Sequence, residues 1–211
     1  KLIVESLKQN PNKVKAVISA SAIGYYGQDK NAGKFFTEDD PADNNFLGET
    51  CKLWEESITP VTALNKRLVK LRIGIVLSKN GGALKEFITP LKMGVAAILG
   101  NGKQMISWVH IDDLCRLFLF AIENEKINGV YNAVAPAPVN NKTLTLTLTK
   151  KMKPLLYIPF YVPVFILKIM LGDRSIEILK SATVSCRKII AAGFYFKFEN
   201  IEGALEDLMK H

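Results

Sequence analysis

Two long apolar runs constrain the fold of this 211-residue chain more than any other feature. Val14 to Ala22 is rich in β-branched residues and ends in small ones, and Arg67 to Leu77 is apolar almost throughout. Neither run alternates as a strand with one solvated face would, so each is predicted to be a strand buried on both faces. Helix-like stretches precede and separate the runs, at Leu2 to Leu7 and Leu47 to Ile58, where Pro60 ends the second. This order indicates an α/β fold with a parallel sheet.

The rest of the chain continues the alternation of helix and strand. Three further helices are expected from apolar spacing and capping residues. They are Ala83 to Met93, a helix capped by Asp112 that runs to about Glu125, and Ile201 to Met209. Three further strands are expected at Gln104 to Val109, Gly129 to Ala133 and Phe194 to Phe198, the last after a helix stop at Gly193.

Charge and cysteine content exclude several classes of protein. The net charge is +8, but the basic residues are spread along the chain and only Lys150, Lys151 and Lys153 cluster, so nucleic acid is not an expected partner. The three cysteines lie far apart without a CxxC motif and only two histidines are present, which predicts neither a metal site nor a disulfide framework. The first residues lack the features of a signal peptide. A reducing, cytoplasmic location is therefore expected.

The apolar stretch from Leu155 to Leu171 is open to two interpretations. It has the hydrophobicity of a membrane span, but Pro159, Pro163 and Lys168 interrupt it and it is shorter than the roughly 20 residues that a bilayer needs. We favour a buried connector followed by a helix, and we expect no membrane partner.

Small and hydroxyl residues end the first strand, at Ser19, Ala20 and Ser21. Ligands of doubly wound sheets bind beyond the carboxyl ends of the strands. Small side chains there let a flat cofactor ring approach the backbone, and a serine hydroxyl can hydrogen-bond a substrate oxygen. Without further information, a serine satisfied at a strand end remains the simpler interpretation.

Several motifs in register resemble the extended short-chain dehydrogenase/reductase superfamily. They are VISASAIGYYG (17–27), LRIGIVLSKNGGAL (71–84), ISWVHIDDL (106–114), GVYNAVAPAPVNN (129–141) and AGFYFKF (192–198). Together they resemble an atypical branch related to NAD-dependent epimerases and dehydratases, which ends in a small C-terminal domain of unknown function. The resemblance covers nearly the whole chain. It implies the C-terminal part of a Rossmann-like doubly wound parallel sheet plus a small α/β lobe on the substrate side.

The resemblance also settles an ambiguous segment and implies domain boundaries. Leu144 to Thr149 has strict period two, which taken alone predicts a strand, but Asn141 can cap a helix and the family has a helix here, so we expect a helix. Residues 1–78 are expected to be the C-terminal half of a dinucleotide-binding domain. Residues 79–211 are expected to form the substrate-side lobe and C-terminal domain, interleaved with the first part around residues 104–135.

The catalytic residues implied by the family are incomplete in this chain. Ser21 matches the family's catalytic Ser or Thr. The Tyr-x-x-x-Lys pair, in which a nearby lysine lowers the pKa of a general acid/base tyrosine, is replaced by Phe46 and Thr50. Neither residue can transfer that proton. The candidates to replace the tyrosine are Tyr25, Tyr26 and Glu49, although adjacent tyrosines more often serve packing.

The sequence also lacks a glycine-rich turn between a strand and a helix near its start, the element that holds a dinucleotide's pyrophosphate. We therefore expect that the cofactor-binding N-terminal part is missing from this chain, and that NADP or NAD binds in a longer protein rather than firmly to this chain. A sheet without its first half exposes an edge strand, so a homodimer is expected.

The remaining candidates are assigned by resemblance to the two sides of the cleft. The cofactor side takes Ser19, Ala20, Arg72, Gly74, Ile75 and Val76. The substrate side takes Trp108, His110, Asp112 and, as a phosphate contact, Lys85. A histidine beside a helix start more often orients a neighbour than acts as a base, and an N-cap role explains Asp112 equally well.

These observations leave three hypotheses about function. The first is a NAD(P)-dependent oxidoreductase of the epimerase type that acts on an unidentified, nucleotide-linked small molecule. The second is a dinucleotide-binding regulator without catalysis, which the absence of the Tyr-x-x-x-Lys pair favours. The third is a structural or interaction domain without a ligand.

Overall fold

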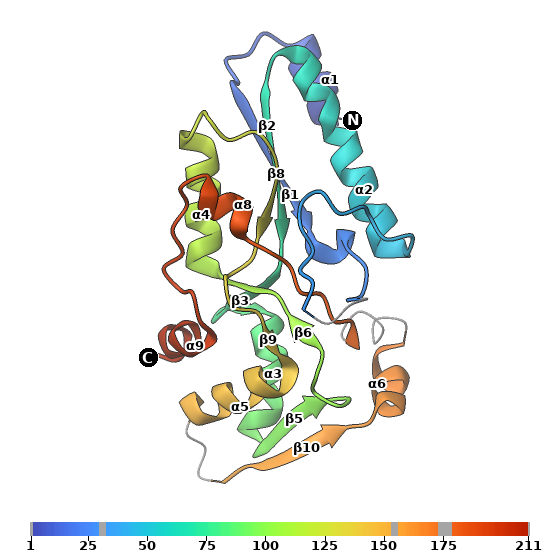
Figure 1. Ribbon diagram of the computed structural model, residues 1–211, viewed down its shortest axis with the longest axis vertical. Coiled ribbons are helices and arrows are strands. Elements are labelled where there is room, and N and C mark those ends of the chain that lie inside the picture. Colours follow the sequence, from blue (N-terminus) through green and yellow to red (C-terminus); the bar gives the residue numbers. More distant parts are fainter. Residues whose placement is uncertain (1, 30–32, 153–155, 173–178, 211) are drawn as a thin grey trace.

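Three parallel strands form the main sheet of the protein. The computed structural model describes residues 2–29, 33–152, 156–172 and 179–210. Strands β1 (Ala16–Ala22), β2 (Arg67–Ile73) and β8 (Gly129–Ala133) pair in the order β1-β2-β8 (Figure 1). Ser21 is in register with Arg72, and Arg72 with Asn132. The carboxyl ends of the strands therefore lie side by side, and the predicted parallel α/β fold is confirmed.

Helices cover both faces of this sheet. On one face, Leu68 of β2 packs with Ile58 and Val61, which belong to α2 (Phe46–Ile58) and the 3-10 helix η2 (Thr59–Leu64), beside α1 (Leu2–Gln9). On the other face, Val69 and Leu71 join a core with residues of α4 (Ile111–Glu123). Neighbouring residues of β2 thus enter different cores, which explains why the strand shows no polar alternation.

A second lobe lies below the main sheet in Figure 1. Its core unites α3 (Ala83–Lys92), α5 (Asn141–Met152) and α9 (Ile201–Met209) around Trp108. Strand β5 (Val95–Leu99) pairs in parallel with β10 (Ile158–Val162), which leads into α6 (Val164–Leu171). Short strands join the two parts: β3 (Ile75–Ser78) between β4 (Gly81–Gly82) and β7 (Trp108–His110), and β6 (Met105–Ile106) with β9 (Val139–Asn140).

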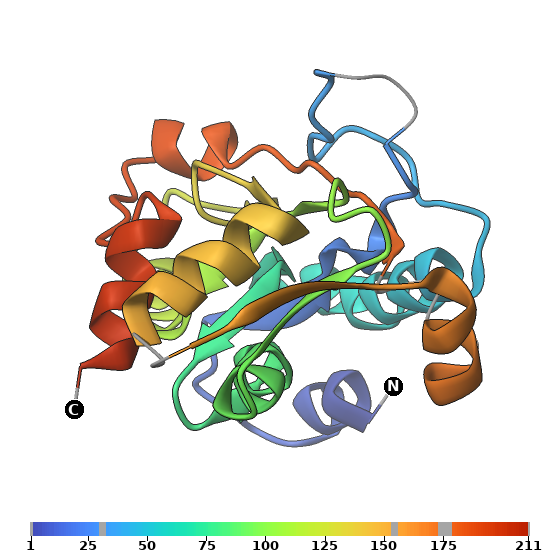
Figure 2. The same ribbon diagram turned by 90° about the horizontal axis from the view of Figure 1, so that it is seen from below.

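The chain crosses between the two parts several times. It leaves the main sheet after β2 and returns with α4 and β8. It then builds β9 to α6 in the second lobe, packs α8 (Arg187–Ala191) on β8, and ends with α9 against α5. The two parts are therefore made of interleaved segments (Figures 1 and 2).

Two predicted strands are each divided in the structure. Arg67 to Leu77 splits at Gly74 into β2 and β3, which belong to different sheets. A Cβ on Gly74 would lie 2.5 Å from the carbonyl oxygen of Ser107, so only glycine allows the two backbones to approach there. Gln104 to Val109 splits at Ser107 into β6 and β7.

The predicted strand from Phe194 to Phe198 is wrong. The segment is irregular, although its alternate residues Phe194, Phe196 and Phe198 are buried. The buried carboxylate of Asp113 accepts hydrogen bonds from the backbone N–H groups of Lys197 and Phe198, both at 2.8 Å. A side chain thus satisfies the backbone groups that a neighbouring strand would otherwise have bound.

The helix expected over Leu144 to Thr149 is confirmed as part of α5. Leu144 and Leu148 lie one turn apart and are fully buried, so the repeat fits a helical face as well as a strand. The expected cap is wrong by one residue. The Asn140 side chain accepts from the N–H of Thr143 at 2.8 Å, whereas Asn141 accepts from Leu99 of β5.

The connector that was expected to be buried is exposed instead over residues 156–161, and Leu155 lies outside the described residues. Residues 158–161 of β10 all face solvent, and α6 buries only Leu167 among its described side chains. No helix in the described part of the chain has the length and apolarity to cross a bilayer.

Candidate functional site

A buried ion pair lies at the carboxyl ends of the main strands. Arg72 of β2 donates from Nε to Glu55 Oε1 at 2.8 Å and from Nη2 to Oε2 at 3.0 Å. Both side chains are buried, and Glu55 reaches the pair from the sheet-facing side of α2. The fork of the guanidinium matches the carboxylate, which is the strongest geometry for such a pair.

Two further side chains of the parallel strands contact Glu55. Ser21 of β1 donates its hydroxyl to Oε1 at 2.8 Å, and Lys70 Nζ lies 3.7 Å from Oε2. The Ser21 hydroxyl, which the family uses toward substrate, therefore binds a protein carboxylate here. We call Ser21, Glu55, Arg72, Tyr26 and Asn132 the strand-end cluster.

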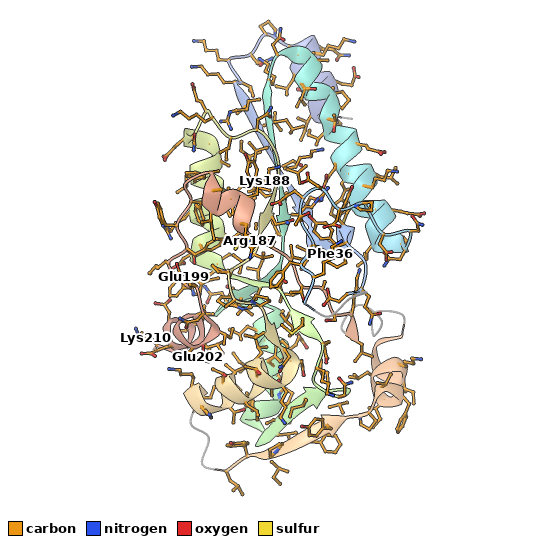
Figure 3. The ribbon with its side chains drawn as sticks, in the orientation of Figure 1. Phe36, Arg187, Lys188, Glu199, Glu202 and Lys210 are labelled. Atoms are coloured by element: carbon orange, nitrogen blue, oxygen red, sulfur yellow. The ribbon has the colours of Figure 1, made fainter. Side chains whose placement is uncertain are left out.

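Tyr26 completes this cluster on the side of β8. Its hydroxyl accepts from Arg72 Nη1 at 2.9 Å and donates to Asn132 Oδ1 at 2.7 Å, and the side chain is fully buried. Its ring stacks on Phe36 with centroids 5.2 Å apart, where the 24–45 loop meets the segment before α8 (Figure 3). Burial raises the pKa of Tyr26 to about 12, although Arg72 opposes the shift. Tyr26 is thus a poor proton donor near neutral pH.

The environment of Glu55 and Arg72 favours the charged form of both side chains. Burial alone would raise the pKa of Glu55, but the hydrogen bonds and charge of Arg72, with help from Ser21 and Lys70, lower it below its ordinary value. Burial likewise acts to lower the pKa of Arg72, and its bonds to Glu55 and Tyr26 outweigh that effect and raise it. The pair stays ionised throughout the physiological range.

The other two candidates for proton transfer are more open. Tyr25 is half-buried, and the guanidinium carbon of Arg72 lies 3.4 Å from its ring centroid. Glu49 is exposed on the first turn of α2. Phe46 begins that helix and is 80% exposed, and Thr50 donates its hydroxyl back to the Phe46 carbonyl. The two positions of the family dyad thus lie on the exposed side of α2, away from Glu55.

Apart from Arg72, the residues assigned to the cofactor side lie either near the end of β1 or between the end of β2 and the start of β3. Ser19 and Ala20 lie near the end of β1, with Ala20 exposed, so a small exposed surface is present where a flat ring would stack. Gly74 packs against Ser107, and Val76 joins the main core. Ile75 is 39% exposed at the start of β3.

The substrate-side candidates are not gathered at the strand-end cluster. Trp108 is fully buried in the second lobe, and Lys85 is exposed on α3. His110, not Asp112, caps α4, because its Nδ1 accepts from the Asp112 N–H at 3.1 Å. Asp112 is exposed, and the neighbouring Asp113 is the buried carboxylate that binds the C-terminal segment.

Sequence reasoning missed the partners that organise this region, above all Glu55. Its signal lay in the helical spacing: Gly48, Cys51, Glu55 and Ile58 form the buried stripe of α2. A buried glutamate needs hydrogen-bond donors or a cation, and here Arg72 and Lys70 of β2 supply the positive charge.

A small cavity opens near the cluster. It measures about 210 Å³ and is lined by Gly27, Phe36, Asp40, Asp43 and neighbouring residues. A larger hollow of about 800 Å³, lined by Lys15, Asn65 and Arg67 among others, lies at the amino ends of β1 and β2. The rule that ligands bind at the carboxyl ends of parallel strands favours the smaller one. Among the described residues, no cluster of His, Cys, Asp or Glu could hold a metal ion.

Two family models match this chain. Residues 2–133 match the NAD dependent epimerase/dehydratase family, and residues 162–208 match a domain of unknown function, DUF1731. The chain belongs to the NAD dependent epimerase/dehydratase family. It is 35% identical over 204 residues to the epimerase family protein YfhF of Bacillus subtilis. The aligned region covers 96% of this chain and 66% of YfhF.

Other relatives also match nearly the whole of this chain. The chloroplastic SDR39U1 homolog of Arabidopsis thaliana is 32% identical over 99% of this chain, which spans 59% of that protein. The crystal structure of human epimerase family protein SDR39U1 with NADPH superimposes with a TM-score of 0.86 at 26% identity, over 99% of this chain and 70% of that one. A nucleoside-diphosphate sugar epimerase from Corynebacterium glutamicum gives 0.78 at 27% identity, over 99% of this chain and 40% of that one. The chain thus spans about two thirds or less of these curated relatives.

Proposed function

We propose that this chain supplies the substrate-side residues of an NADP(H)-dependent oxidoreductase that acts on a nucleotide-linked small molecule rather than on nucleic acid. The observation that carries the proposal is the strand-end cluster, which gathers Ser21, Arg72 and Tyr26 at the carboxyl ends of β1, β2 and β8. Family membership supports the cofactor class, and the human relative described with NADPH supports NADP over NAD.

The residues present fit one end of such a cofactor. Ala20 offers an exposed small side chain near the end of β1, which suits the nicotinamide ring. Arg72 is already paired with Glu55, and the sequence has no glycine-rich turn for the pyrophosphate, so the other end of the cofactor needs further residues. When bound, the nicotinamide supplies or accepts hydride. This chain's own part would be to orient the substrate and to move a proton through Tyr25 or Glu49.

A non-catalytic dinucleotide-binding regulator is the second candidate function. Phe46 and Thr50 occupy the positions of the Tyr-x-x-x-Lys pair, and neither can act as its acid or base. Ser21 donates to Glu55, and the raised pKa of Tyr26 opposes proton transfer. A protein with these features could bind NADPH and report its concentration without turnover.

Titration with NADPH followed by a turnover screen separates the two candidates. The protein should bind NADPH and oxidise it with one class of nucleotide-linked carbonyl compounds. Tyr25→Phe should then lower kcat and leave the affinity for NADPH unchanged, whereas Tyr195→Phe, on the exposed C-terminal segment, serves as a control. NADPH binding without turnover across the screen would favour the regulator, and a failure to bind either dinucleotide would reject both.

We also propose a homodimer in a reducing compartment such as the cytoplasm. Within the described residues, β1 pairs only with β2, and α2 exposes Phe46, Leu53 and Trp54. All three cysteines are unpaired. Light scattering with Trp54→Glu tests the dimer, since a charge in such an interface should dissociate it.

A further inference from the structure

The outer rim of the second lobe exposes a row of apolar side chains. Five of them, between Leu156 and Ile169, are 50% to 80% exposed, and they are Leu156, Ile158, Phe160, Phe165 and Ile169. Monomeric proteins seldom expose so many contiguous apolar groups unless the surface binds something. We call β10 and α6, with Leu156 and Tyr157, the apolar rim.

The geometry of the rim directs these side chains outward. Ile158 and Phe160 are two residues apart and share one face of β10, and Leu156 precedes the strand. Phe165 and Ile169 are one turn apart on α6, with the exposed Lys168 on the same stripe. Figure 2, viewed from below, shows β10 crossing the end of the molecule with α6 beside it, and Figure 3 shows side chains projecting along that lower edge.

The lobe that carries the rim is strongly basic. Residues 83–103 and 139–172 contain eight lysines and one glutamate, a net charge of +7, and the acidic residues Glu202, Glu206 and Asp207 of α9 reduce the charge of the lobe to +4. Lys142 on this lobe lies 5.9 Å from the ring centroid of Tyr161 on β10. The acidic residues Glu199 and Glu202 lie at the α9 end, on the opposite side from α6 (Figures 1 and 3).

We propose that the apolar rim docks on the surface of an anionic lipid bilayer. Aliphatic and aromatic side chains enter the boundary between headgroups and acyl chains, while lysines on the same body attract anionic headgroups. Nucleic acid would share the charge complementarity and could stack on Phe160 and Phe165, but it would leave the aliphatic Leu156, Ile158 and Ile169 exposed, whereas a bilayer buries both kinds of side chain. An acidic protein partner would need an apolar face of its own. We therefore no longer expect that the protein has no membrane partner. Its contact with the bilayer would be peripheral, without a spanning segment.

Flotation of the full chain with lipid vesicles tests this docking. The protein should float with vesicles of phosphatidylcholine and phosphatidylglycerol in equal parts, and not with phosphatidylcholine alone. Raising the salt from about 0.1 M to about 1 M shortens the Debye length from about 10 Å to about 3 Å and should release most of it. Lys168→Glu should weaken binding about tenfold, whereas Lys126→Glu, an exposed lysine in the loop after α4, should have a much smaller effect.

Apolar variants separate insertion from simple charge attraction. Ile158→Ser with Phe165→Ser should weaken vesicle binding about tenfold or more, because apolar area no longer enters the bilayer. Leu119→Ser with Ile122→Ser, at comparably exposed positions of α4, should leave it unchanged, and all variants should melt within a few degrees of the parent. Equal binding of both vesicle types, no binding, or indifference to the rim variants would overturn the proposal. Binding of RNA in place of vesicles, or rim-dependent dimers, would assign the surface to another occupant.

Discussion

Arg72 on β2 donates two nearly parallel hydrogen bonds to Glu55 on α2, and so joins the end of a central strand to the inner side of the neighbouring helix. The same helix carries Phe46 and Thr50, at the two positions to which the resemblance assigns the dyad. The buried pair of Glu55 and Arg72 thus lies beneath the helix, whereas the two dyad positions lie on its exposed side. Any proton transfer at this site would have to proceed without the tyrosine and lysine of the dyad.

Breaking the ion pair from one side should be costly. Arg72→Met or Glu55→Leu alone should each lower the free energy of unfolding by about 3–5 kcal/mol, because a buried charge is left without its partner. The double variant should lose less than the sum of the two. Urea denaturation measures all three, and Lys52→Ala, which removes an exposed ion pair with Glu56, should cost no more than about 1 kcal/mol. Additive losses would show that the two charges are not coupled.

His110 should make stability depend on pH. Burial lowers the pKa of His110, although Asp112, Asp207 and Asp113 oppose the shift. The unfolded chain, with a histidine pKa of about 6.5, therefore binds more protons below that pH, and the free energy of unfolding falls as the pH drops. Above that pH the contribution is constant.

The variant His110→Asn isolates this effect. Asparagine keeps a side-chain acceptor for the Asp112 N–H and does not titrate. Urea midpoints measured between about pH 5 and about pH 7 should change less in the variant than in the parent. Since His211 is the only other histidine and is present in both proteins, equal slopes would rule out His110 as the source.

Gly74→Ala should destabilise the junction between the two parts. The added Cβ would lie 2.5 Å from the Ser107 carbonyl oxygen and 2.7 Å from a methyl carbon of Val134, so backbone must move. We expect a loss of about 1–3 kcal/mol, as for other overpacked sites. Gly24→Ala is the matched control, because its Cβ would meet only ordinary contacts at 3.6 Å or more. Equal thermal melting of both variants would contradict the close approach.

Asp113 and Asp112 should differ sharply despite being neighbours. Asp113→Asn replaces a carboxylate that accepts from Arg116 and from two backbone N–H groups, so it should cost about 1–3 kcal/mol. Asp112→Asn changes an exposed side chain and should stay within about 0.5 kcal/mol. Hydrogen exchange at Lys197 and Phe198 should accelerate only in the first variant.

The sequence predicted most of the helices and the buried strands of the main sheet, but not the partners that connect them. Continuous apolar strands such as Arg67 to Ile73 signal burial on both faces, and the leucines of α5 fit a helical face once a neighbouring core is present. The division of strands at Gly74 and Ser107 could not be predicted, because it depends on two backbones that are distant in sequence. The pairing of Glu55 with Arg72 depends on strand register. Asp113 can accept from the backbone N–H of Lys197, 84 residues later, only after the chain has folded back next to it.

Because the chain crosses repeatedly between its two parts, its last segment depends on the rest of the chain to fold. Residues 162–208, which match DUF1731, supply α6 to the second lobe, α8 to the main sheet and most of α9 to the second lobe again. Helices α8 and α9 pack into two separate cores that consist mostly of residues from earlier in the chain. On its own, the segment would expose the apolar residues of α8 and α9, because the surfaces that bury them would be missing. This unit of sequence is therefore not a unit of folding.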